Sequence, residues 1–270
     1  MDSLTIIIPA RLGATRFPRK MLHPVLDKPL ILWTVEAASR SKKAGGVIVA
    51  TDDEEILKLV TDAGFDARMT RSDHPSGTDR VWEIASGLQA KWIINLQGDE
   101  PLMTADALDS LADVAFQIED RNQPVEMVTL IGDLDPEDAR DPNRVKVVTD
   151  LEGNALYFSR SPIPYPRIVS ELSETGQDPA RYLLHVGVYL YRRDVLERLV
   201  SLKRSPLERV EGLEQLRALE NGIRIKCVHA DHEFLGVDVQ TDVPRVEAIL
   251  RARAMEGSGG RDHSRYECEE

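Results

Sequence analysis

The order of strand-like and helix-like segments constrains the fold most strongly. Residues 5–8, 47–50 and 92–96 are short apolar runs, typical of buried strands. Apolar side chains at helical spacing separate them, first after Pro29 and again after Asp52 and Asp53, which resemble a helix cap. This β-α-β-α order predicts an α/β fold in which a mostly parallel sheet is flanked by helices.

The pattern changes near residue 133, and a smaller β-rich part is predicted over about residues 133–192. Residues 145–149 and 155–158 read as a β-hairpin, and residues 183–191 as a further strand. Proline and polar residues at 161–181 predict a loop.

The helical pattern resumes at Ser205, which begins a capping box. A last helix is expected after Thr241, so residues 1–256 are treated as one domain. Residues 257–270 are rich in glycine, serine and charge and predict a disordered tail.

The charge balance excludes several classes of partner. The 270 residues include 46 Asp and Glu against 34 Lys and Arg, a formal net charge of −12. This excess disfavours nucleic acid and anionic membrane surfaces. No apolar stretch approaches the length of a membrane span. The two cysteines, Cys227 and Cys268, match no disulfide framework or metal motif, so we expect a reduced, cytoplasmic protein.

One loop is basic against this acidic background. No acidic residue occurs between Leu4 and Leu26, whereas Arg11, Arg16, Arg19 and Lys20 all fall there. Ligands of open α/β sheets bind beyond the carboxyl ends of the strands, so this position predicts a phosphate-binding loop of exposed cations. A solvated basic loop is the alternative, and the placement after a strand favours phosphate. Neither the dinucleotide-binding glycine fingerprint nor the P-loop motif is present.

Two carboxylates also follow strand-like runs. Asp99 comes directly after the strand at 92–96, and Asp238 follows another short apolar run. Together at one sheet edge they would hold Mg²⁺ on phosphate oxygens. Asp238 could equally cap the helix near Thr241, and spacing supports both interpretations alike. His229 and His232 have no third ligand nearby, so we expect no transition metal there.

Several polar residues of the C-terminal half have weaker patterns. Arg160, Arg167 and His185, taken singly, are more often structural than functional, although together they could bind a carboxylate. Glu214 and Gln215 lie mid-helix, where such residues usually face solvent.

These residues belong to an ordered series of motifs that resembles the cytidylyltransferases that activate 3-deoxy-manno-octulosonate (Kdo), the CMP-Kdo synthetases. The resemblance covers about residues 4–255. It rests on Ile-Pro-Ala-Arg at 8–11, Ala-Thr-Asp at 50–52, Ser-Gly-Thr at 76–78, Gln-Gly-Asp-Glu-Pro at 97–101, His-Val-Gly-Val-Tyr at 185–189, Ser-Pro-Leu-Glu at 205–208, Leu-Glu-Gln-Leu-Arg at 213–217 and Gly-Val-Asp at 236–238. Two departures lie in the basic loop: Ala14 replaces a small hydroxyl residue, and Arg19 replaces glycine.

The resemblance implies a nucleotide-diphospho-sugar transferase-like fold, with the β-rich part forming a homodimer. It implies transfer of CMP from CTP to Kdo, with release of pyrophosphate, for lipopolysaccharide biosynthesis. The same transfer to another acid sugar, such as 8-amino-Kdo or sialic acid, is one alternative. A catalytically idle nucleotide-binding paralogue is another. A dinucleotide-dependent oxidoreductase is disfavoured, because this sequence lacks the glycine fingerprint of such enzymes.

The resemblance also implies a role for each candidate residue. The catalytic residues would be Arg11, Arg16, Lys20, Asp99 and Asp238, and the last two would bind Mg²⁺. The nucleotide would be bound by Ala10, Arg11, Lys20, Ser76, Gly77, Gln97 and Gly98. The acid sugar would be bound by Arg160, Arg167, His185, Glu214 and Gln215.

Overall fold

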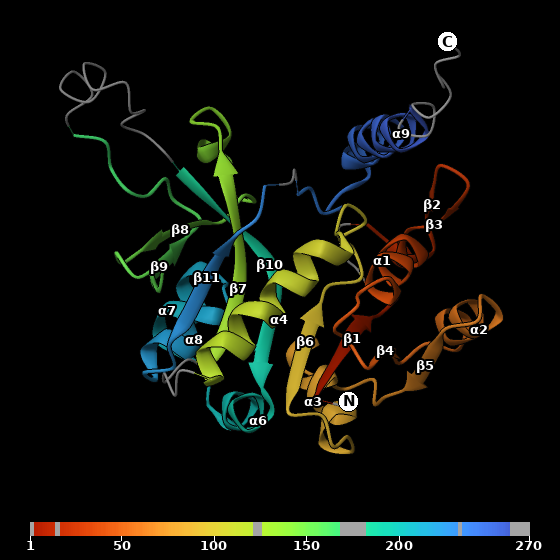
Figure 1. Cartoon of the computed structure of the whole chain (residues 1–270), viewed down its shortest axis with the longest axis horizontal. Helices are drawn as coiled ribbons and strands as arrows, with labels where there is room; N and C mark the ends of the chain where they lie inside the picture. Colours follow the sequence, from red (N-terminus) through yellow and green to blue (C-terminus); the bar gives the residue numbers. More distant parts are fainter. Residues whose placement is uncertain (1–2, 14–16, 121–125, 168–181, 232–233, 260–270) are drawn as a thin grey trace, which may run out of the picture.

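A nine-stranded mixed sheet organises the chain (Figure 1). The computed structural model describes residues 3–13, 17–120, 126–167, 182–231 and 234–259. The main strand order is β11-β7-β10-β6-β1-β4-β5, and β8 pairs with both β10 and β9. The strands are β1 (Leu4–Ala10), β4 (Gly46–Thr51), β5 (Asp66–Met69), β6 (Trp92–Leu96), β7 (Met127–Leu134), β8 (Lys146–Thr149), β9 (Ala155–Ser159), β10 (Tyr182–Arg192) and β11 (Ile225–His229), with a separate ribbon of β2 (Pro24–Val25) and β3 (Lys28–Pro29).

The N-terminal half of the sheet is parallel, as its sequence pattern predicts. β1 pairs in parallel with β4 and β6, and β4 pairs in parallel with β5. β10 is antiparallel to its neighbours β6 and β7, and β11 is parallel to β7. The α/β fold is therefore confirmed, with one reversed strand, β10, in the main strand order.

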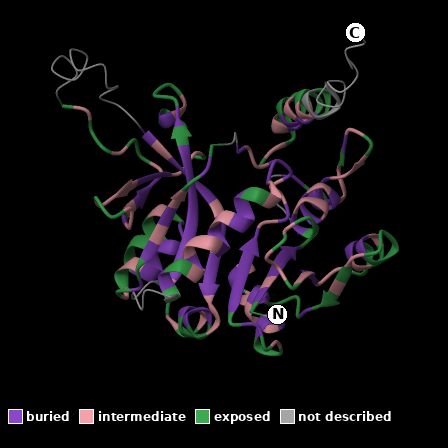
Figure 2. Ribbon diagram, in the orientation of Figure 1, coloured by how far each residue is buried: buried purple, intermediate pink, exposed green. Residues whose placement is uncertain are grey.

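Helices cover both faces of this sheet. They are α1 (Leu30–Ser39), α2 (Glu54–Asp62), α3 (Gly77–Ser86), α4 (Ala105–Asp120), α6 (Arg193–Ser201), α7 (Pro206–Glu211), α8 (Gln215–Glu220) and α9 (Val243–Gly259), with short 3-10 turns at Lys20–Leu22, Asp138–Arg140 and Gln240–Asp242. β1 shows the alternation: Ile6 and Ile8 pack with α1, α2 and α4, whereas Ile7 packs with α3, α6 and α8. The central strands β1, β4, β6, β7 and β10 are accordingly buried along most of their length (Figure 2).

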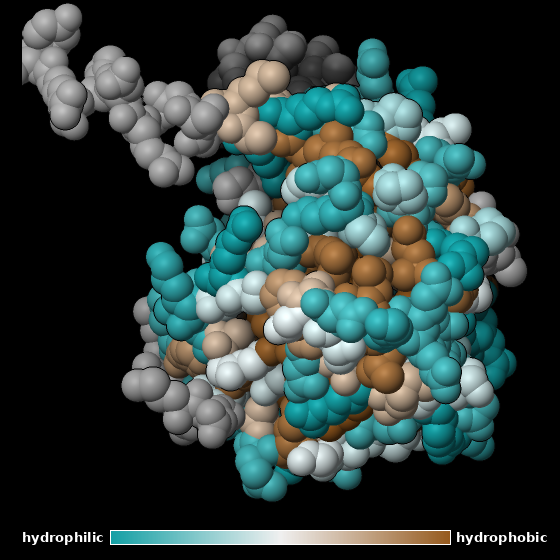
Figure 3. Space-filling model, turned by 90° about the vertical axis from the view of Figure 1, so that its right-hand side faces the viewer, coloured by the Kyte–Doolittle hydropathy of each residue, from teal (hydrophilic) through white to brown (hydrophobic). Residues whose placement is uncertain are grey.

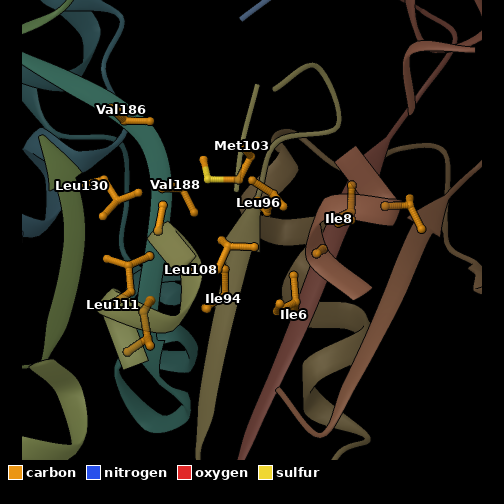
Figure 4. Packing of buried hydrophobic residues seen from close by; sticks show 14 of the residues in the cluster. Ile6, Ile8, Ile94, Leu96, Met103, Leu108, Leu111, Leu130, Val186 and Val188 are labelled. Atoms are coloured by element: carbon orange, nitrogen blue, oxygen red, sulfur yellow. The ribbon is translucent and has the colours of Figure 1, made fainter. Parts of the chain in front are cut away.

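Figure 4 shows the layer beneath α4. Leu108 and Leu111 of α4 lie over Ile94 of β6 and Leu130 of β7, and all four are fully buried. Packing on this scale stabilises the strand positions, so the loops at the carboxyl edge of the sheet start from a rigid base.

The β-rich part predicted over about 133–192 is only partly set apart from the main sheet. The β8–β9 hairpin forms as expected. β10, however, belongs to the main sheet, because it pairs with β7 at Tyr182 to Val186 and at Tyr189 to Tyr191, and its residues Val188 to Arg192 pair with β6 on the other side. Residues 168–181 of the expected loop lie outside the described residues.

The end of the chain also differs from the prediction. α9 continues to Gly259, so residues 257–259 of the expected tail are helical, and residues 260–270 lie outside the described part. Within the described residues, no helix combines the length and apolar character that crossing a membrane requires.

Candidate active site

A cavity of about 780 Å³ opens at the carboxyl edge of the parallel strands. It brings together eight of the predicted site residues, although they come from seven separate parts of the sequence. They are Arg11, Gly77, Gln97, Arg160, His185, Glu214, Gln215 and Asp238.

A lysine and two carboxylates meet beside this cavity. The Lys20 ammonium contacts the Asp99 carboxylate, and its Nζ lies 4.0 Å from Asp238 Oδ1. The Val237 N–H donates to the Asp99 carbonyl at 2.9 Å, which ties the loop before α9 to the loop after β6. The two predicted metal carboxylates are therefore neighbours, as expected. Lys20 itself is only 7% exposed, so the expectation of an exposed loop cation is wrong.

This arrangement fits Mg²⁺. Two carboxylates within reach of one ammonium group could share one divalent cation, and Mg²⁺ usually takes one or two carboxylates together with phosphates and waters. Among the described residues, no three His, Cys, Asp or Glu side chains form a complete metal cage. The ligands that remain would therefore be oxygens of the nucleotide and water.

Asp242 accepts two backbone hydrogen bonds at this turn. Its Oδ2 accepts from the N–H groups of Asp238 and Val239, at 2.8 and 2.9 Å. The Asp238 side chain is half exposed and lines the cavity. The geometry thus favours the metal interpretation of Asp238 over the helix cap.

Glu100 is a site residue that the sequence interpretation missed. Burial, and then the charges of Asp99 and Asp238, raise its pKa to about 8. Its carboxyl group fits because Gly236 has no side chain: a Cβ there would lie 3.0 Å from Glu100 Oε1. Its position directly after Asp99 was the available indication.

Arg19, which stands where glycine is usual in the resembled family, adopts a backbone conformation that favours glycine. Its φ of 58° lies in the left-handed region that favours glycine, the residue usual in the family that the sequence resembles. In this chain the guanidinium reaches Glu55 of α2 at 2.5 Å, and this hydrogen bond raises the Arg19 pKa. Arg16 and Ala14 lie outside the described residues.

Three of the predicted nucleotide-binding residues have clear structural roles. The Ser76 hydroxyl caps α3, accepting from the Asp79 N–H and donating to Asp79 Oδ2 at 2.6 Å. Gly98 packs so tightly that a Cβ would lie 2.8 Å from Ile31 Cδ1. Ala10 is the buried last residue of β1. Gly77, by contrast, lines the cavity beside Gln97.

The opposite end of the cavity holds a neutral histidine and two residues of α8 and its cap. Burial lowers the His185 pKa to about 3, and its Nε2 lies 3.3 Å from Thr129 Oγ1. Glu214 accepts from Thr78 Oγ1 at 2.7 Å. Within the described part of the chain, Gln215 Nε2 is buried without a hydrogen-bond partner. Such a group costs free energy until a ligand satisfies it.

The two predicted arginines of this end differ. The Arg160 guanidinium donates to the carbonyls of Glu211, Pro142 and Gly212, at 2.7, 2.9 and 3.4 Å. Three of its five N–H groups thus join two loops, which leaves two for a ligand. Arg167 is exposed next to residues 168–181 and is not among the side chains that line the cavity.

Buried polar residues near the cavity were also missed. Lys146 is fully buried and donates to the carbonyls of Asp141 and Arg160, at 3.0 and 2.6 Å. Asn95 and Thr78 line the cavity. Asn95 could have been found, because a polar residue within the apolar run at 92–96 requires an explanation.

The cytidylyltransferase family model matches residues 5–225. The chain belongs to the cytidylyltransferase family. It is therefore a nucleotidyltransferase, and its basic loop and paired carboxylates occupy the sheet edge at which such an enzyme is expected to bind a nucleotide.

Similar proteins narrow the comparison within this cytidylyltransferase family. The chain is 46% identical to the 3-deoxy-manno-octulosonate cytidylyltransferase of Syntrophotalea carbinolica, over 92% of this chain and 99% of that protein. It is 44% identical to the protein of the same name from Solibacter usitatus, over 94% and 96%.

Solved structures of similar proteins support the same family assignment. A CMP:2-keto-3-deoxy-manno-octonic acid synthetase complexed with CTP superposes with a TM-score of 0.83 at 40% identity, covering 93% of this chain and 99% of that chain. A glucose-1-phosphate thymidylyltransferase structure from Bacillus anthracis, described as putative, matches at 15% identity and a TM-score of 0.58, over 92% and 95%. That second likeness concerns the fold alone.

Proposed function

We propose that this enzyme transfers CMP from CTP to Kdo, giving CMP-Kdo and pyrophosphate, and so activates Kdo for lipopolysaccharide biosynthesis. The observation that carries the proposal is the cavity itself. The Lys20, Asp99 and Asp238 cluster beside it suits a nucleoside triphosphate, and its far end offers the unsatisfied Gln215 Nε2 to a polar sugar. Relatives that bear the name of this activity are 44 and 46% identical over nearly their whole length.

The reaction requires positioning and charge neutralisation more than covalent chemistry. The anomeric hydroxyl of Kdo attacks the α-phosphorus of CTP, and pyrophosphate leaves in line. Arg11, Arg16 and Lys20 hold the phosphates. Gly77 and Gln97 contact the cytidine.

The sugar is held at the other end of the cavity. Glu214 and Gln215 bind its hydroxyl groups, and neutral His185 offers a hydrogen bond without a charge. Arg160 directs its two remaining N–H groups at the sugar carboxylate. Arg167 is proposed to add a second guanidinium to this carboxylate.

Mg²⁺ would be held by Asp99 and Asp238, and when bound it would neutralise phosphate charge and acidify the attacking hydroxyl. The chain's own contribution is to keep these two carboxylates together through the backbone hydrogen bond between Val237 and Asp99.

The test is to measure pyrophosphate release with each nucleoside triphosphate and each acid sugar in the presence of Mg²⁺. We expect release from CTP with Kdo, and little with ATP or GTP. Faster pyrophosphate release with 8-amino-Kdo or sialic acid would identify that sugar, and not Kdo, as the substrate. Release that needs no acid sugar, or that prefers a purine nucleotide, would contradict the proposal.

The same proposal places the enzyme in the cytoplasm. The buried, free Cys227 suits a reducing compartment.

We further propose that the enzyme is a homodimer joined through the β8–β9 hairpin. This hairpin lies at the left of Figure 1, where Leu151 in its turn and Leu156 on β9 are 108% and 61% exposed. Exposed leucines on such a hairpin suit a contact with a second copy. The double variant Leu151→Asp/Leu156→Asp is expected to be monomeric in light scattering.

Met69→Asp is the matched control for this prediction. Met69 is 46% exposed on β5, at the opposite end of the sheet. β5 lies at the right of Figure 1, and Figure 3 views the molecule from that side. That variant should remain dimeric. A monomeric unchanged protein at assay concentration, or equal effects of both substitutions, would contradict the proposed interface.

A further inference from the structure

A chain of side-chain hydrogen bonds crosses the floor of the cavity. Gln97 Nε2 donates to Asn95 Oδ1 at 3.1 Å. Asn95 Nδ2 donates to Thr78 Oγ1 at 3.5 Å, and Thr78 Oγ1 donates to Glu214 Oε2 at 2.7 Å. Each inner residue therefore accepts from one neighbour and donates to the next.

The two inner residues are almost completely removed from solvent. Asn95 is 1% exposed within β6, and Thr78 is 7% exposed in the first turn of α3. Glu214 precedes α8, so three separate elements meet in the chain. Burying polar groups costs free energy unless their hydrogen bonds are made, and a fully bonded network fixes side-chain orientation.

The ends of the chain belong to the two halves of the proposed site. Gln97 lies on the nucleotide side, next to Gly77, and its Oε1 would lie 3.8 Å from a Cβ at Gly77. Glu214 lies on the sugar side, next to Gln215. The direction of the hydrogen bonds leaves Gln97 Oε1 as an acceptor and one Glu214 oxygen free of this chain.

We propose that Asn95 and Thr78 are positioning residues, which hold the Gln97 amide and the Glu214 carboxylate in fixed orientations and so couple the nucleotide and sugar halves of the cavity. The proposal rests on the function proposed above. Neither residue transfers a proton or touches the reacting atoms, so each acts through the residue at its end of the chain.

The first experiment compares Thr78→Val with Thr78→Ser by steady-state pyrophosphate release. Valine keeps the shape but removes the hydroxyl, so kcat/KM for the acid sugar should fall about 10–100-fold, the usual loss when an outer hydrogen-bonding partner is removed. Serine keeps the hydroxyl, so Thr78→Ser should retain most of the kcat/KM of the unchanged enzyme. Equal losses in both variants would overturn the proposal.

A double-mutant cycle tests whether Thr78 acts through Glu214. In the Glu214→Ala background, Thr78→Val should cause no further loss, because the group that it orients is gone. An undiminished loss in that background would mean that Thr78 affects the fold rather than the Glu214 carboxylate. Melting curves of each variant separate loss of folded protein from loss of rate.

CTP binding in the absence of sugar provides a readout that does not depend on turnover. By titration calorimetry, Asn95→Leu should weaken CTP binding in the unchanged background and have no effect in the Gln97→Ala background. Equal weakening in both would overturn the proposal. If Asn95→Leu does not fold, Thr78→Val replaces it in the calorimetric titration. Thr78→Val should weaken CTP binding by a smaller factor than it lowers kcat/KM for the acid sugar.

These measurements also distinguish failure of the network from failure of the function. If the unchanged enzyme releases pyrophosphate from CTP and Kdo, the proposed function stands whatever the variants show. If the protein binds CTP but prefers another acid sugar, the same variants are tested with that sugar, and the same results are expected. A protein that neither binds CTP nor releases pyrophosphate would overturn both proposals.

Discussion

Replacing Asp238 by Asn is expected to lower turnover by about 10²–10³-fold, the usual loss when one preorganised electrostatic contact is removed from a site. The substitution keeps the shape of the side chain and removes its charge. Asp238 Oδ1 lies 4.0 Å from Lys20 Nζ in the cluster that would hold Mg²⁺. The loss should be partly relieved at high Mg²⁺, because a weaker site can still be filled.

The melting temperature should change little in this variant. The Asp238 side chain is 50% exposed, and pairs at such positions contribute little to stability. The control is Asp242→Ala, which removes the acceptor of two backbone N–H groups and should cost about 1 kcal/mol, as loss of a helix cap does. Near-normal turnover of Asp238→Asn at low Mg²⁺ would return Asp238 to a structural role.

Lys20→Met is expected to lower both turnover and the stability of the metal-free enzyme. Lys20 is 7% exposed and pairs with Asp99, while Glu100 and Asp238 are close by. Removing the ammonium leaves the carboxylates of Asp99 and Asp238 to repel one another. Breaking a buried ion pair commonly costs about 3–5 kcal/mol, and the partial exposure of Asp99 and Asp238 should bring the loss below that range.

Mg²⁺ should restore much of this stability without restoring turnover. In Lys20→Met the divalent ion can take the place of the ammonium between Asp99 and Asp238, so its binding in the absence of nucleotide should be tighter than in the unchanged enzyme. Melting curves with and without Mg²⁺ measure this, with Lys58→Met on exposed α2 as the control. A Lys20→Met enzyme that melts normally in a chelator would contradict the prediction.

The parts of the fold that follow from local periodicity could be predicted. The strands at 5–8, 47–50 and 92–96 alternate with amphipathic helices, and this order fixes a parallel sheet and places Asp99 at its edge. The direction of β10 could not be predicted, since an apolar run looks alike in parallel and antiparallel pairing. Its place between β6 and β7 depends on tertiary contacts.

Side-chain environments within the site were less predictable, because they too depend on tertiary contacts. Nothing local distinguishes a buried Lys20 from an exposed loop lysine, because Asp99 is 79 residues away. The positive φ of Arg19 contradicts the local preference of arginine and is imposed by the turn before Lys20. Glu100 owes its raised pKa to burial first and then to the charges of Asp99 and Asp238, and neither its burial nor the approach of Asp238, 138 residues along the chain, can be read from the local sequence.

The eleven-residue strand β10 has a consequence for allosteric inhibition. His185 lies on this strand, which pairs with β8 at Leu183 and Leu184 and with β6 from Val188 onward. A small molecule seated on the β8–β9 hairpin would therefore act on the same hydrogen-bonded strand that carries the cavity histidine. If the proposed sugar contact of His185 holds, a ligand that shifts this strand would change acid-sugar affinity, and by thermodynamic reciprocity the sugar would change the affinity of that ligand equally.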